Sequence, residues 1–175
     1  MNTAWMVDRL ERFPAVLDEL LDGVDETDAH YRASEDDWSI VEIICHLADE
    51  DRDDFGRRLR LLIESPEADW PKIDPVSAAV EREYHSRSLL TSLADFKSAR
   101  KQGVIWLNGL GKIDCTIAAL HPRLVHPRYG AMDVGDMLAS WCAHDALHLR
   151  QLAHRFHQLA IRKAGDHDTG YAGEW

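Results

Sequence analysis

Cysteine is scarce in this sequence, and its spacing excludes two classes of small protein. The 175 residues include three cysteines, Cys45, Cys115 and Cys142. An odd number without a CxxC pair is neither a disulfide framework nor a zinc-finger pattern. Because Cys45 and Cys142 lie in segments with helical periodicity, we interpret them as reduced, buried apolar side chains.

Long hydrophobic runs and excess positive charge are also missing. No stretch approaches the ~18 apolar residues of a transmembrane span, and the opening MNTAWMVDRLER lacks the apolar core of a signal peptide. The formal net charge of −11 opposes binding to a phosphate backbone or to an anionic membrane surface. We therefore expect a cytoplasmic protein that binds neither nucleic acid nor membrane.

The period-two alternation of strands is nearly absent, whereas four segments show helical periodicity. They cover about residues 3–21, 40–64, 76–107 (with a start that the pattern leaves open) and 133–163. Ser39 and Glu42 form the capping-box pattern that begins a helix. Without a repeat or a long linker, the sequence predicts one all-α domain over residues 1–163. We expect an antiparallel four-helix bundle, followed by a loose C-terminal tail at 164–175.

Ten histidines are present, and His144 and His148 are the one pair spaced four apart. On a helix the two side chains lie about 40° apart, one turn above the other, so both can reach one metal ion. Such a pair can arise by chance, and its position is the stronger evidence: His148 falls inside the apolar arc of its helix and His144 at the edge. The alternative is a pair of core histidines bonded to buried polar partners.

A third ligand has to come from another helix. His46 lies at the edge of the apolar face of segment 40–64, and Glu50 follows it by one turn as an additional ligand or an acceptor for its imidazole. Asp145 also projects toward the apolar arc, where a carboxylate orients a metal-bound histidine or acts as an acid or base; the alternative is a solvated aspartate. Most of the acidic run DEDRDD at 49–54 is expected to be a solvated helix face.

The order of these motifs resembles the DinB-like superfamily of damage-inducible helical bundles. The matching segments are DWSIVEI at 37–43 with HLAD at 46–49, HPRYG at 126–130 and WCAHDALHLRQ at 141–151, and the resemblance extends to about Ala160. It implies a four-helix bundle, often dimeric, in which His46, His144 and His148 surround zinc, nickel or a similar ion. Gln151 matches the glutamine of the family's H-x-x-x-H-x-x-Q ending. Relatives of known activity include thiol-dependent S-transferases and a mycothiol-dependent maleylpyruvate isomerase, and other members are non-catalytic.

Three protein ligands leave a tetrahedral ion one open position, as in catalytic zinc sites. We therefore expect a metal-dependent enzyme of the thiol S-transferase or hydrolase type. Its partners would be a small-molecule substrate, such as a low-molecular-weight thiol, and a second copy of the chain in a homodimer. Asp145 or Glu50 would orient the ligands or move a proton, and Gln151 would hold substrate or water. The alternative is a non-enzymatic metal-binding stress or interaction protein with a structural site. The enzyme hypothesis and the structural-site hypothesis differ in whether a cleft reaches the open coordination position of the metal.

Overall fold

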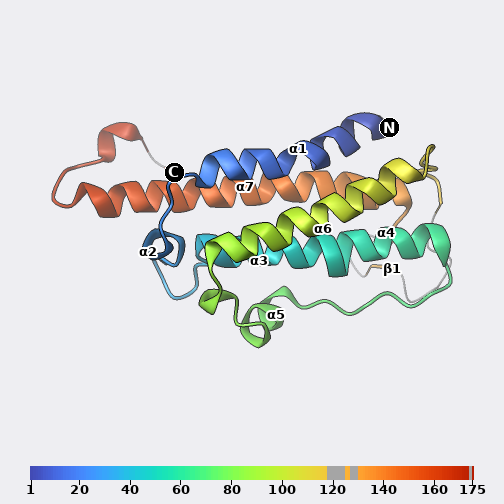
Figure 1. The fold of residues 1–175 in the computed structure, drawn as a ribbon, viewed down its shortest axis with the longest axis horizontal. Coiled ribbons are helices and arrows are strands. Elements are labelled where there is room, and N and C mark those ends of the chain that lie inside the picture. The colour runs from blue at the N-terminus through green and yellow to red at the C-terminus, as the bar shows by residue number, and fades with distance from the viewer. Residues whose placement is uncertain (118–124, 127–129, 174) are drawn as a thin grey trace.

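The computed structural model describes residues 1–117, 125–126, 130–173 and 175, and within them the protein is almost entirely helical (Figure 1). Its main helices are α1 (Thr3–Leu21), α2 (Glu26–Ala29), α3 (Ile40–Asp49), α4 (Phe55–Glu64), α5 (Pro75–Glu81), α6 (Leu89–Gly109) and α7 (Val134–Ala164). A π-helical turn, η1 (Glu50–Asp54), joins α3 to α4, and 3-10 turns lie at η2 (Tyr84–Ser86) and η4 (Gly170–Ala172). Strands β1 (Val125–His126) and β2 (Gly130–Ala131) pair antiparallel. The all-α, four-helix-bundle prediction is confirmed.

Four long rods make the bundle: α1, the continuous rod α3–η1–α4, α6 and α7 (Figure 1). The rods α1 and α7 run in one direction, and α3–η1–α4 and α6 run in the other. Neighbours are therefore antiparallel where α1 packs on α6 and α4 on α7, but parallel where α3 packs on α6 and α1 on α7. Two consecutive parallel rods need a connection that returns along the bundle, which residues 65–88 provide.

The third predicted helix begins later than residue 76. Helix α5 ends at Glu81, Glu83 adopts a left-handed φ of 51°, and α6 begins only at Leu89. The Ser88 side chain accepts a hydrogen bond from the backbone N–H of Thr91 at 3.2 Å and so caps the new helix. The segment before it belongs to the crossover and not to the bundle.

The two largest clusters of the hydrophobic core are separated by a polar layer. One cluster includes Leu17, Ile44 and Phe96, and the other includes Leu10, Leu59 and Trp141. Between them, on three different rods, lie the buried Asp51, Arg100 and Asp145. The middle of the bundle is therefore polar, and the candidate site lies at this level.

The acidic run at 49–54 is not the solvated helix face that the sequence predicted. Asp49, Glu50 and Asp51 are all buried, because the π-helical turn inserts a residue and rotates this part of the rod inward. Gly56 permits the turn, since a Cβ on it would lie 2.1 Å from the carbonyl oxygen of Asp51.

The tail beyond α7 is not entirely loose. The ring of Trp175 stacks on His154 of α7, with 5.1 Å between the ring centroids. The chain end therefore folds back onto the last helix, as the position of the C-terminus in Figure 1 shows.

Candidate metal centre

Three imidazoles from two rods meet at the level of the polar layer. His46 comes from α3, and His144 and His148 come from successive turns of α7. The Nε2 atom of His144 lies 3.3 Å from Nε2 of His46 and 3.0 Å from Nε2 of His148. Three nitrogens bound to one tetrahedral ion at ~2.0–2.1 Å would lie about 3.3 Å apart. The donor set and its spacing therefore fit one divalent transition-metal ion.

All three imidazoles are held in the neutral form that binds metal. Burial, followed by the charge of His148, lowers the pKa of His46 to about 3. Burial and the two other histidines lower the pKa of His144 to about 3, and burial also lowers the pKa of His148. Metal ligation requires unprotonated imidazole nitrogens, so the centre is ready for a cation at neutral pH.

Outer contacts fix the direction of the lone pairs. The side-chain oxygen of Gln151 accepts a hydrogen bond from Nδ1 of His148 at 2.7 Å, which leaves Nε2 of that ring with a lone pair. Glu50 Oε1 lies 3.7 Å from Nδ1 of His46, on the side away from the other imidazoles. The Nε2 atoms of His46 and His148 therefore both face Nε2 of His144, as the nitrogens of three imidazole ligands of one ion do.

Two aromatic rings hold the imidazoles from outside. Trp38 packs on His46 with 4.9 Å between centroids, and Phe55 packs on His144 at 5.0 Å. The sequence prediction did not assign either residue to the site. The sequence gives one indication of their role. Trp38 lies just before α3 and Phe55 just after the π-helical turn, so both are near His46 along the chain.

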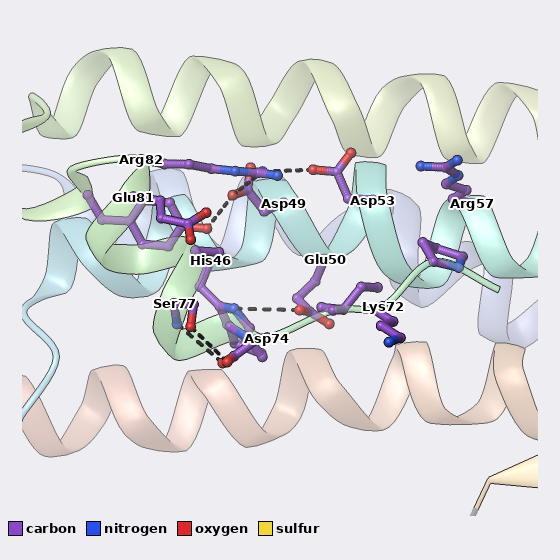
Figure 2. Close-up of a pocket in the computed structure, with 15 residues that line it drawn as sticks. His46, Asp49, Glu50, Asp53, Arg57, Lys72, Asp74, Ser77, Glu81 and Arg82 are labelled. Atoms are coloured by element: carbon purple, nitrogen blue, oxygen red, sulfur yellow. Dashed lines mark hydrogen bonds and ion pairs between the residues drawn. The ribbon is translucent and has the colours of Figure 1, made fainter.

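The imidazoles open into clefts. A central cleft of about 650 Å³ is lined by all three histidines and also by Glu50, Gln151 and Arg155. A lateral cleft of about 350 Å³ lies on the other face of His46 and Glu50, and Figure 2 shows both residues inside it. The crossover residues Ile73 and Pro75 line both clefts, as His46 and Glu50 do.

The candidate acid–base residues occupy different places. Glu50 lies beside His46 and lines both clefts; burial, followed by the nearby Asp54, raises its pKa to about 8. Asp145 instead accepts hydrogen bonds on both oxygens from Arg100, at 2.6 and 2.7 Å, and burial raises its pKa to about 6. The structure thus brings Glu50 and Gln151 to the imidazoles and ties Asp145 to the polar layer.

The sequence prediction also missed Arg100, which binds two buried carboxylates in this region. The guanidinium is 1% exposed and also binds Asp51, through Nε at 2.6 Å and Nη2 at 2.9 Å. Trp141 Nε1 donates to Asp51 at 2.7 Å, and Arg100 Nη1 donates to the carbonyl of Leu10 at 3.1 Å. This network holds α7 in place at Asp145, the residue that directly follows His144.

The fold and the centre define a class: helical bundles with a three-histidine site between two rods. The profile of the DinB superfamily matches residues 9–152, and the chain belongs to that superfamily. A solved structure of YfiT from Bacillus subtilis, described as a probable metal-dependent hydrolase with an unusual four-helix bundle topology, has the same fold. The TM-score is 0.76 at 14% identity, over 90% of this chain and 87% of that one. No curated protein matches the chain significantly.

Within the residues that the structure describes, none of the helices is both long enough and apolar enough to cross a bilayer.

Proposed function

We propose that the protein is a metal-dependent enzyme of the hydrolase type that acts on a small molecule. His46, His144 and His148 would hold one divalent transition-metal ion, zinc or nickel. The opening of the central cleft onto the three imidazoles carries this proposal, because structural metal sites are closed by protein ligands whereas catalytic sites keep one position accessible. The description of YfiT as a probable metal-dependent hydrolase supports the same reaction class.

The chemistry divides between the ion and the chain. A bound divalent ion would supply Lewis acidity at the floor of the cleft. In hydrolysis of an ester or amide, the oxygen of water bonds to the carbonyl carbon, the bond to the leaving group breaks, and the leaving group takes a proton. Glu50 lies beside the imidazoles in the cleft and is placed to hold that proton. Gln151 keeps His148 in the ligand tautomer.

Asp145 would act through its neighbours and not on the substrate. Its two bonds to Arg100 fix the helix turn that carries His144. We assign it a positioning role in this proposal.

Transfer to a thiol is the second candidate, and the lateral cleft favours it. Two clefts meet at His46 and Glu50, so two molecules can approach the centre from different sides (Figure 2). In that reaction the sulfur of a low-molecular-weight thiol, instead of water, would bond to the carbon that loses its leaving group, and the leaving group would take the thiol proton.

The test combines metal content with activity. Protein purified without an affinity tag should contain about one equivalent of a divalent transition metal by elemental analysis. The loaded protein should then hydrolyse members of a panel of small esters and amides, or transfer a thiol to an electrophile. His148→Ala should abolish both metal and activity, whereas His157→Ala, on the same helix but outside the centre, should change neither. Stoichiometric metal in the His148→Ala protein would contradict the ligand assignment.

A homodimer is part of the same proposal. Trp5 and Val16 on α1 are 55% and 43% exposed, and they lie on one face of that helix. Burial of such residues favours association of two copies. A monomeric mass by light scattering at micromolar concentration would contradict it.

A further inference from the structure

A groove between α4 and α7 adjoins the metal centre and is lined mainly by apolar side chains. Its volume is about 740 Å³, within the usual range of small-molecule pockets. The apolar lining consists of Phe55, Met132, Met137, Ala143 and Leu147. We call it the apolar groove.

Most polar side chains that line the groove are already engaged. Asp54 pairs with Arg58 at 3.0 Å. Asp136 belongs to the capping box of α7 and accepts a hydrogen bond from the backbone N–H of Asp133. Ser140 adds one hydroxyl group to this wall. The groove therefore offers a ligand mainly apolar contact.

The apolar groove is continuous with the central cleft. His144, Leu147, Asp54 and Arg58 line both. Leu147 is 50% exposed at the junction, and Phe55 brings the groove wall to within 5.0 Å, between ring centroids, of His144. An apolar group in the groove would thus lie directly beside one ligand of the centre, while a polar group attached to it would reach Gln151 and Arg155.

We infer that the apolar groove binds an alkyl or aryl group of the substrate. The substrate is then a molecule with an apolar part in the groove and a polar part in the central cleft, joined by the bond that is hydrolysed over the three imidazoles. This inference rests on the proposed function. Each methylene that enters the groove should tighten binding about two- to fourfold, since burial of a CH₂ group changes affinity by about that factor.

Alkyl hydroxamates of increasing length test the inference on zinc-loaded protein. Their headgroup binds an open zinc position, and the tail reports on the neighbouring surface. Calorimetry should show octanohydroxamate binding at least about tenfold more tightly than acetohydroxamate. In protein carrying ¹³C-methyl methionine, the tail should shift the resonances of Met132 and Met137 and leave those of Met1 and Met6, which do not line the groove.

Two alanines on one helix provide a matched pair of variants. Both Ala143 and Ala146 are exposed on α7, but only Ala143 lines the groove. Ala143→Trp should fill the groove and bring the affinities for the two hydroxamates to within about twofold of each other. Ala146→Trp should retain the wild-type dependence on tail length, and metal content should be normal in both.

The outcomes separate this inference from the proposed function. Equal affinity for short and long tails, or tail-induced shifts confined to Met1 and Met6, overturns the inference while the metal site stands. If zinc-loaded protein does not bind acetohydroxamate at all, the open metal site is wrong. In that case the methionine shifts caused by octanohydroxamate in metal-free protein still decide whether the groove accepts an alkyl group.

Discussion

Two buried polar clusters lie next to each other on α7 and differ in one respect. Asp145 belongs to the polar layer, where Arg100 is bound by two carboxylates and a backbone carbonyl. His144, one residue earlier, belongs to the metal centre, where three neutral rings turn their Nε2 atoms toward one another. The first cluster contains its own cation, and the second contains only ligands for one.

This difference separates a structural network from a binding site. Burial of charge is tolerated when the partners are present within the chain, so the polar layer is complete without a ligand. Three imidazole nitrogens that face one another instead form a donor set that fits a cation from outside the chain. The cleft of about 650 Å³ beside the imidazoles agrees with this distinction.

Removal of the internal cation should produce the largest effect. Arg100→Met leaves Asp51 and Asp145 buried without their partner, which should lower the free energy of unfolding by about 3–5 kcal/mol. Chemical denaturation of metal-free protein measures it. Lys97→Met on the same helix breaks an exposed pair with Asp18 and should cost at most about 1 kcal/mol.

A triple variant checks the reason for that loss. Arg100→Met combined with Asp51→Asn and Asp145→Asn removes all three charges, and it should recover part of the stability. If the triple variant is as unstable as Arg100→Met alone, unpaired charge is not the cause.

Removal of one imidazole should affect the other cluster in a different way. His148→Ala should weaken metal binding by more than the ten- to hundredfold that is typical for loss of an outer partner of a ligand. The unfolding midpoint of metal-free protein should change much less than its metal affinity does. Competition with a chromogenic chelator gives the affinity, and a metal affinity within tenfold of wild type would exclude His148 as a ligand.

Loss of the outer partner should have a smaller effect. Gln151→Leu removes the acceptor for Nδ1 of His148 and should reduce metal affinity about ten- to hundredfold. Gln151→Glu keeps an acceptor there and should remain closer to wild type than Gln151→Leu does. Equal losses in the two variants would argue that Gln151 acts by packing alone.

The last comparison concerns the pH dependence of stability in metal-free protein, whose effect is small just below pH 6.5 and grows as the pH falls. The pKa of His144 is about 3 in the folded protein and about 6.5 in an unfolded chain, so the unfolded state takes up the proton first as pH falls. Stability from the neutral ring is complete above pH 6.5 and is lost between about pH 6.5 and 3, by up to ~1.4 kcal/mol per pH unit. His144→Asn should flatten this decline relative to His167→Asn, which removes an exposed tail histidine. Parallel curves for the two variants would contradict the lowered pKa.

The local sequence predicted the helix starts that depend on neighbouring residues. Ser39 and Glu42 make both halves of their capping box, and Asp133 caps α7 with Asp136. The proximity of His144 and His148 was also predictable, because helical spacing places the two side chains on one face. Features that depend on one helix alone can be predicted from the sequence of that helix.

The features that the sequence did not reveal depend on distant partners. The hydrophobic pattern of the π-helical turn does not differ from that of an ordinary helix. The turn places Asp51 against Arg100, which lies 49 residues later in the chain. The same holds for Asp145, whose position on the apolar arc was read correctly but whose partner lies on α6. A buried charge indicates that a partner exists, but its identity depends on how the rods pack.

The crossover at residues 65–88 has a consequence for how specificity can change. It exists because α3–η1–α4 and α6 run parallel, and its Ile73 and Pro75 line both the central and the lateral cleft. Its Trp70 packs against one main core cluster, and its Tyr84 is buried against Val41 and Cys45 of α3. Between these two aromatic anchors, substitutions in the crossover can reshape the clefts while the bundle and its histidines stay in place, so that one scaffold can be adapted to new substrates.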